Sequence, residues 1–330
     1  MRAIAAGLGF LGRRLVQAAF VMLVILIIAF AVKNALGDPL REIVGEAVPE
    51  AEREQLMHEL GLDAPWPVQL ARYLGGAVDG DLGTSLIYKR PTLEVILAKF
   101  PASFELVLGA SLIVLLFSLP AGIYCAVRAQ ARGARLILSL SALGISIPVF
   151  LTGIFLITVF SVWLGWLPAF GRGDTVRIGF WETGLLTADG LEHLILPAVT
   201  LSSIMLPLFI RLMRGAMLDE LGHDYVRTAR AKGASHLRVW IAHALRNALL
   251  PLVAVGALQI GTLIAYTLLT ETVFQWPGMG FLFLEAVTRA DIPLITTYLV
   301  FVGLIFVVTN TLVDIVSLAL DPRISLEGAR

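Results

Sequence analysis

Residues 106–127 read LVLGASLIVLLFSLPAGIYCAV, a run of 22 residues without a charged side chain. About 20 mostly apolar residues are enough for a helix to cross the hydrocarbon core of a bilayer. The whole chain of 330 residues shares this character, since 58% of it is hydrophobic, 15% is charged and its mean hydropathy is +0.85. A soluble domain typically holds about 25% charged residues. The sequence therefore predicts an integral membrane protein.

Five further apolar stretches flank this run and predict an all-α polytopic protein with six transmembrane helices. These stretches cover residues 15–32, 136–163, 194–210, 249–269 and 294–318. Pro148, Pro197 and Pro207 interrupt two of them, but neighbouring helices in a bundle can satisfy the carbonyls that a proline frees. Small residues such as Gly109 and Gly122 allow helices to approach closely in lipid.

Lysine and arginine gather in alternate loops, which predicts the orientation of the spans. The basic residues of one set of loops are Arg2, Arg13, Arg14, Arg128, Arg132, Arg135, Arg211, Arg214, Arg227, Arg230, Lys232, Arg238 and Arg246. The loops after the third and fifth spans are rich in acids instead. Both termini and the loop 211–248 are therefore expected in the cytoplasm, in a multi-pass protein of the cytoplasmic membrane.

Three sections follow from these spans. Residues 1–32 form a short cytoplasmic end and the first span, which also resembles a signal peptide but has a longer apolar run than the usual 7–15 residues or so. Residues 33–99 form an extracytoplasmic segment, with short helices expected at 50–60 and 66–74, which either caps the bundle or docks an external protein. Residues 100–330 hold the other five spans and the loop 211–248.

Catalytic and metal-binding patterns are missing from the sequence. It holds no HExxH, no GxSxG and no clustered cysteines and histidines. His236 and His243, seven residues apart, share a face of a predicted helix and are interpreted as an interfacial or solvated pair. Cys125, the only cysteine, is interpreted as a small buried hydrophobe. We expect no metal, no cofactor and no enzymatic activity, and the zero net charge gives no reason to expect a nucleic-acid partner.

A Walker A nucleotide site is excluded by the lysines. The motif GxxxxGK[ST] needs a lysine directly after a glycine. The four lysines, each with the residue before it, are Val32-Lys33, Tyr88-Lys89, Ala98-Lys99 and Ala231-Lys232. If ATP drives this protein, another polypeptide must bind it.

Few ionisable residues lie in the spans. Glu105 begins the second span, Asp314 lies near the end of the sixth, and Arg211 and Glu271 lie at helix ends. Transporters coupled to ion gradients often carry such residues near the bilayer midplane. The pattern weakens the interpretation as a self-contained secondary transporter but leaves it open.

The polar stretch 224–251, DYVRTARAKGASHLRVWIAHALRNALLP, lies between two strongly apolar segments. Asp224 is expected to cap a helix over 225–232, which Gly233 ends in the left-handed conformation. Ser235 is expected to cap a second helix that leads into the fifth span. On physical grounds this stretch is either a rigid contact site for a protein partner or a solvated basic loop beside the lipid.

Motifs along almost the whole chain resemble those of ABC importer permeases of the dipeptide/oligopeptide/nickel subfamily, first permease type. In the loop these are RTARAKG and HALRNALLP. Elsewhere they are GDP at 37–39, ELGLDAPWPVQLARYLGG at 59–76, GDLGTSL at 80–86, PVFLTGIFLI, LGWLPAFG, ETVFQWPGMG at 271–280 and LDPRIS. Arg227, Thr228 and Ala229 stand where the general family signature has Glu-Ala-Ala, and Leu250-Pro251 follows later than usual, departures that suit the peptide-importer branch.

This resemblance implies a type I ABC importer permease that moves its substrate by alternating access. A helix of the loop would insert in a cleft of a separate ATPase subunit, which alone binds ATP. The residues implied at this contact are Asp224, Tyr225, Val226, Arg227, Thr228, Ala229, Arg230, Ala231, Lys232 and Gly233. The expected partners are a second related permease, two ATPases, an extracytoplasmic solute-binding protein and membrane lipid.

The substrate stays open at this point. Dipeptides, oligopeptides, nickel chelates, glutathione and opines are all carried by relatives of this branch, where selectivity rests mainly with the binding protein. A membrane enzyme or a structural scaffold is the third interpretation. It would need a cluster of catalytic polar residues near the bilayer, and the sequence offers none.

Overall fold

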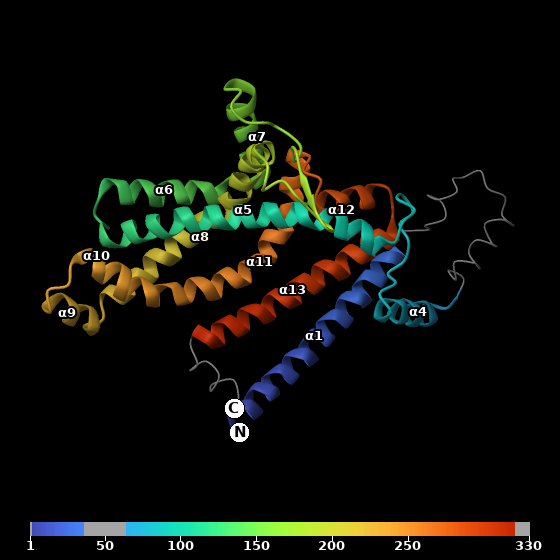
Figure 1. Ribbon diagram of the computed structural model, residues 1–330, viewed down its shortest axis with the longest axis horizontal. Helices are drawn as coiled ribbons and strands as arrows, with labels where there is room; N and C mark the ends of the chain where they lie inside the picture. The colour runs from blue at the N-terminus through green and yellow to red at the C-terminus, as the bar shows by residue number, and fades with distance from the viewer. Residues whose placement is uncertain (1, 36–63, 321–330) are drawn as a thin grey trace. The chain divides into compact units, whose positions relative to one another are not determined.

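The computed structural model describes residues 2–35 and 64–320, which form a helical protein with one small β-hairpin in this part of the chain (Figure 1). The chain divides into two compact units. Unit 1 comprises residues 1–101 and 278–308, and unit 2 comprises residues 102–277 and 309–330. The expected helix at 50–60 lies outside the described residues.

Unit 1 is built from helices that come from both halves of the sequence. They are α1 (Arg2–Ala35), α4 (Trp66–Val78), the start of α5 (Thr92–Val127), α12 (Met279–Thr288) and most of α13 (Ile292–Leu320). The expected helix at 66–74 is confirmed as α4. It begins directly after Pro65 and carries Pro67 in its first turn, where a missing N–H costs nothing.

The apolar core of unit 1 joins α5, α12 and α13. Ile96, Leu282, Leu294 and Ile295 are almost completely buried in it. The ring of Phe283 stacks on that of Tyr298, with 4.4 Å between centroids. The short apolar helix α12 is thus held by side-chain packing to the start of α13.

The turn after α4 is fixed to α13 by a buried carboxylate. Asp291 is fully buried, and its Oδ2 accepts hydrogen bonds from Ser85 Oγ at 2.5 Å and from Ile87 N at 3.1 Å. Its Oδ1 accepts from Leu294 N at 3.2 Å, in the first turn of α13. Tyr88 donates to Glu285 at 2.8 Å, and burial together with this bond raises the pKa of Tyr88 to about 12. The GDLGTS link predicted from sequence is therefore a docked turn.

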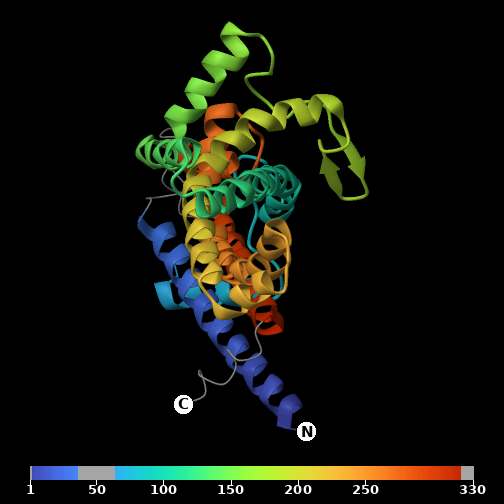
Figure 2. The same ribbon diagram turned by 90° about the vertical axis from the view of Figure 1, so that its left-hand side faces the viewer.

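Unit 2 holds the rest of α5 and all elements up to α11. These are α6 (Arg132–Ser146), α7 (Val149–Leu156), the π-helix η1 (Ile157–Trp163), β1 (Val176–Ile178), β2 (Trp181–Thr183), α8 (Ala188–Leu221), α9 (Asp224–Ala231), α10 (His236–Arg238), the π-helix η2 (Val239–Leu245) and α11 (Arg246–Phe274). The strands pair antiparallel, with Arg177 opposite Glu182, and the hairpin stands at the N-terminal end of α8 (Figure 2).

Helix α8 is the centre of unit 2. It packs against α6, α7 and α11. Of the residues in its most apolar 18-residue stretch, 61% are buried, against 28% for the corresponding stretch of α5. Leu201, Met213 and Met217 on α8 are completely buried. Pro197 and Pro207 lie inside this helix without ending it. The tolerance for prolines expected from the sequence is confirmed here.

The third predicted span, 136–163, is two helices instead of one. The segments Arg132–Gly144 and Val149–Trp163 meet at an angle of 109°. Ile147, between them, is extended with φ −92° and ψ 123°. Proline disfavours the helical conformation of the residue before it and has no N–H to donate, and before Pro148 the chain takes the extended alternative.

Each of the six predicted spans falls on helix, which confirms a helical membrane protein. Four described helices are long and apolar enough to cross a bilayer, and the bent pair gives a fifth. They are Thr92–Val127, Ala188–Leu221, His236–Gly256 and Ile292–Leu312. The first predicted span lies in α1, whose apolar part is Val16–Val32. The fifth begins earlier than expected, since helix runs back from α11 through η2 to His236.

Glycines bring α8 and α11 close to their neighbours, as the sequence predicted. A Cβ at Gly122 on α5 would lie 2.5 Å from the Cβ of Met213 and 2.9 Å from the carbonyl oxygen of Ile210. A Cβ at Gly153 on α7 would lie 3.1 Å from the side chain of Val273 on α11. The contact at Gly122 leaves no room for a methyl group, because a backbone carbonyl cannot turn aside.

We expect Gly122→Ala to destabilise the protein by about 1–3 kcal/mol, the usual cost of overpacking. The measurement is the apparent melting temperature in detergent. The matched control is Gly215→Ala on α8, where nothing lies within 4 Å of the added methyl group. Alanine there should leave the melting temperature unchanged or raise it, since alanine favours helix. Equal melting temperatures for the two variants would contradict the close contact of α5 and α8.

Candidate functional site

The loop between α8 and α11 forms a short helix, α9, at Asp224–Ala231. The prediction that Asp224 caps this helix is wrong. His223 occupies the cap position without a side-chain cap bond, and Asp224 is the first helical residue. Its carboxylate instead pairs with Arg227 at 3.3 Å. An acidic side chain in the first turn of a helix still interacts favourably with the helix dipole, so Asp224 suits the first helical position as well as the cap position.

The end of α9 is built as the sequence predicts. Gly233 has φ +82°, and its N–H donates to the carbonyl of Arg230 at 2.9 Å, while Ala234 N donates to the carbonyl of Ala229 at 3.1 Å. These bonds satisfy two of the last helical carbonyls. Ser235 Oγ accepts from Arg238 N at 3.4 Å and so caps the next helix, as expected. That helix continues through η2 into α11.

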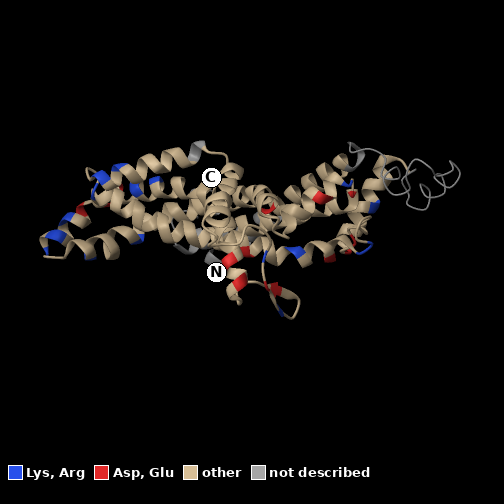
Figure 3. Ribbon diagram, turned by 90° about the horizontal axis from the view of Figure 1, so that it is seen from above, with Lys and Arg blue, Asp and Glu red and all other residues tan. Residues whose placement is uncertain are grey.

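Most of α9 is exposed, but one side chain anchors it. Val226 is completely buried and Ala229 is half-buried. The exposed residues of the predicted contact are Asp224, Tyr225, Arg227, Thr228, Arg230, Ala231, Lys232 and Gly233. Lysine and arginine gather at this end of unit 2 (Figure 3). The structure thus brings all ten predicted contact residues into one ordered, cationic projection.

The other candidates from the sequence have ordinary surroundings. The ring of His236 lies 6.1 Å from that of Trp240, and the carbonyl of His243 lies 3.4 Å from the hydroxyl of Tyr225. Cys125 is buried, with its thiol 3.7 Å from the carbonyl of Ala134. Within residues 2–35 and 64–320, no group of three His, Cys, Asp or Glu residues is placed to hold a metal ion.

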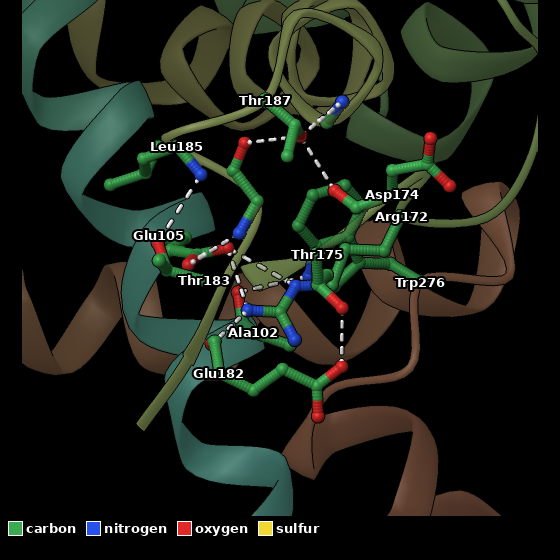
Figure 4. A network of polar contacts seen from close by, with 12 residues as sticks. Ala102, Glu105, Arg172, Asp174, Thr175, Glu182, Thr183, Leu185, Thr187 and Trp276 are labelled. Carbon is green, nitrogen blue, oxygen red and sulfur yellow. Dashed lines mark hydrogen bonds and ion pairs between the residues drawn. The ribbon is translucent and has the colours of Figure 1, made fainter. Parts of the chain in front are cut away.

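A second polar site lies on the part of α5 that belongs to unit 2 and was missed by sequence reasoning. Glu105 and Arg172 are buried and form an ion pair: Arg172 Nη2 and Nε donate to Glu105 Oε2 at 2.8 and 3.1 Å. Arg172 also donates to the carbonyl of Glu182 at 2.7 Å, and Gly184 N donates to Glu105 Oε1 at 3.2 Å. Figure 4 shows the guanidinium lying between α5 and the strand that carries Glu182.

Three further bonds extend this site to α11. Ser103 Oγ donates to Glu271 Oε1 at 2.5 Å, and Glu271 is fully buried. Trp276 Nε1 donates to the carbonyl of Ala102 at 2.9 Å (Figure 4). Gly171 N donates to the carbonyl of Phe274 at 2.9 Å. The stretch of α5 at residues 102–105, the end of α11 and the segment that leads into the hairpin are therefore tied together by buried polar groups.

A sequence signal for this ion pair does exist. Glu105 is the single charged residue between positions 100 and 127. A charge beside a long apolar run is expected to be paired when it is buried. In the loop after the third predicted span, the basic candidates are Arg172 and Arg177. The sequence could have given these two partners but not the choice between them, which depends on the path of the loop.

Two family models cover most of the chain. The model described as "Binding-protein-dependent transport system inner membrane component" matches residues 118–326, and the N-terminal model of the same kind of component matches residues 7–107. The di/tripeptide transport system permease protein DppB of Pseudomonas aeruginosa (strain UCBPP-PA14) is 38% identical over 96% of this chain and 98% of its own length.

Other relatives carry different names at similar identity. The oligopeptide transport system permease protein AppB of Bacillus subtilis (strain 168) is 38% identical over 94% of this chain and 98% of its own. The glutathione transport system permease protein GsiC of Shigella flexneri serotype 5b (strain 8401) is 37% identical over 87% and 89%.

A solved structure of the MetNI methionine ABC transporter, in an inward-facing conformation, shares the fold. Its matching chain has a TM-score of 0.51 at 18% identity, with 67% of this chain and 94% of that chain covered. At this identity the likeness speaks for the architecture alone. It agrees with the type I ABC importer permease fold expected from the sequence.

Removing one partner of the ion pair should leave a buried charge. We expect Arg172→Met to destabilise the protein by about 3–5 kcal/mol, because Glu105 would lose its counterion. The measurement is again the apparent melting temperature in detergent. The double variant Glu105→Leu/Arg172→Met removes both charges and should be more stable than Arg172→Met alone. A double variant that is less stable than the single variant would contradict this account.

Proposed function

Because this chain belongs to the family of binding-protein-dependent transport system inner membrane components, we propose that it is the peptide-carrying permease of an ATP-binding-cassette importer. It is a membrane transport component and not an enzyme. The proposed substrates are dipeptides, oligopeptides or similar small solutes. Relatives that align over nearly their whole length are named for di/tripeptide and oligopeptide transport, which supports the peptide class.

Two observations support ATP hydrolysis by a partner as the source of energy. Helix α9 is exposed, and the sequence contains no Walker A motif. ATP would bind to two separate ATPase subunits, and α9 would insert in a cleft of one of them. Its exposed cations, Arg227, Arg230 and Lys232, suit a partner surface with acidic groups. The buried Val226 would hold the helix to the rest of unit 2 when the partner moves.

Motion of α9 would then change the access of the substrate path. The loop joins α8, the central helix of unit 2, to α11 through short connections. Helix α9 is thus connected to two membrane-spanning helices, both of which must move for alternating access between the two sides of the membrane. In this proposal a second related permease completes the path, and an extracytoplasmic solute-binding protein delivers the substrate.

The ion-coupled alternative gains no support from the buried carboxylate of Glu105. Its charge is matched by Arg172 at 2.8 Å, so this group is already engaged in an ion pair. An ATPase partner remains the proposed source of energy. The proposed location is the cytoplasmic membrane, with α9 on the cytoplasmic side.

Affinity purification of this chain from its native membrane, in a mild detergent, tests the assembly. We expect it to bring along an ATPase that contains a Walker A motif and a second permease, both identified by mass spectrometry. Recovery of this chain alone would overturn the proposal. Purification with Ala229→Asp provides the control, since this variant should lose the ATPase and keep the second permease.

Substitutions at the contact should stop transport without removing the protein from the membrane. We expect Ala229→Asp and Gly233→Asp to abolish peptide uptake by cells, because each places a carboxylate where the cationic helix meets its partner. Membrane fractions probed for the chain show whether it is present. Gly233→Asn is the matched control. Asparagine tolerates the positive φ of this position and adds no charge, so uptake should largely survive. Normal uptake by the two aspartate variants would defeat the contact assignment.

A further inference from the structure

Three side chains meet where α8, α9 and α11 come together. The hydroxyl of Tyr225, in the first turn of α9, donates a hydrogen bond to Oε2 of Glu220, in the last turn of α8. Asn247, in the first turn of α11, donates through Nδ2 to the same Oε2 at 3.3 Å and to the hydroxyl of Tyr225 at 3.2 Å. Each member thus contacts the other two, and each comes from a different helix.

The hydroxyl of Tyr225 is engaged in contacts within the chain, although its side chain is exposed at the surface. Desolvation by burial raises the pKa of Tyr225, and the hydrogen bond to Glu220 raises it further. The ring of His223 lies edge-on to that of Tyr225, with 5.9 Å between centroids. A hydroxyl has one proton to donate. The carboxylate of Glu220 is a stronger acceptor than the carbonyl of His243, which lies 3.4 Å from the hydroxyl of Tyr225. The hydroxyl of Tyr225 therefore donates its proton to Glu220 on α8.

Helix α9 has few other restraints. Only Gly222 and His223 separate it from α8, and residues 232–235 lead from it to α10. Gly233, in the second connection, adopts a positive φ that few other residues accept. Among the side chains of α9, Val226 alone is completely buried. One apolar anchor fixes the position of a short helix but leaves it free to turn about that point, so the bonds of Tyr225 supply the second restraint.

We propose that Tyr225, Glu220 and Asn247 form a latch that makes α9 move as one body with α8 and α11. The inference rests on the proposed function, since a latch matters only if a partner displaces α9. The three are positioning residues: they touch neither substrate nor nucleotide. With the latch closed, a displacement of α9 reaches both helices together. With the latch open, α9 follows the ATPase by turning about Val226, and ATP is hydrolysed without transport.

The test uses the whole transporter, purified with its ATPases and second permease and reconstituted in vesicles with its binding protein. Tyr225→Phe removes only the hydroxyl, Asn247→Ala removes the amide, and Glu220→Gln removes the charge of the acceptor. The readouts are the amount of ATPase that co-purifies, the rate of ATP hydrolysis, and the uptake of a mixture of dipeptides and glutathione quantified by mass spectrometry. A merely structural role would not change the number of molecules carried per ATP.

We expect each variant to retain the ATPase and to hydrolyse ATP, while uptake per ATP falls by roughly threefold or more, as the loss of one or two hydrogen bonds implies. Tyr225→Phe combined with Asn247→Ala should lower the ratio by less than the product of the two single effects, because both act on one network. Tyr124→Phe on α5 and Asp219→Asn beside Glu220 are the matched controls and should keep the wild-type ratio.

Several outcomes would overturn the latch. An unchanged ratio in Tyr225→Phe does so directly. Loss of the ATPase from Tyr225→Phe would make the hydroxyl part of the partner contact instead. Disappearance of all three variants from the membrane would make the triad a determinant of folding. If the wild-type chain carries no ATPase or takes up none of the peptides, the proposed function fails first and the latch fails with it.

Discussion

A bilayer offers no water to a peptide group, so each backbone N–H and C=O within it must find a partner in the protein. This constraint explains why the described spans are helices and why departures from helix are concentrated at a few marked positions. The largest departure is the extended residue Ile147 before Pro148, where the chain bends by 109°. Elsewhere Pro197 and Pro207 lie inside α8, and Pro251 lies inside α11, without ending the helix.

Unit 2 holds two polar clusters that differ in kind. The cluster around Glu105 and Arg172 is buried, and its ion pair is supported by further bonds to Glu182 and Gly184. The cluster around Tyr225 lies at the surface and consists of three bonds between three helices. A buried ion pair resists being opened because either charge alone is costly in a dry environment. A surface network opens more easily, which suits a part of the molecule that a partner is proposed to displace.

The sequence predicted the class of fold and the location of the contact helix, since both depend on local patterns. Long apolar runs indicate spans, and a glycine at position 233 followed by a serine at 235 indicates the end of one helix and the start of the next. The same reasoning misplaced the cap at Asp224, because the choice between neighbouring residues depends on the path of the incoming chain. It also missed the pairing of Glu105 with Arg172 and the bonds among Glu220, Tyr225 and Asn247. Glu105 and Arg172 are 67 positions apart in the sequence, and Glu220 and Asn247 are 27 apart. No local sequence pattern indicates contacts over such separations.

The π-helical segment η2, Val239–Leu245, has a consequence for the phase of α11. A π-turn holds one residue more than an α-turn, and a residue in an α-helix corresponds to a rotation of about 100°. The side chains of α11 therefore face directions that an uninterrupted α-helix from Ser235 would not give them. If the residues of η2 wound as a regular α-helix instead, the hydrophobic composition of the span would be unchanged, yet Asn247 and the small residues of α11 would turn by roughly 100° away from their present neighbours. The facing of this span thus depends on the π-helical conformation of η2 as well as on the residues of α11.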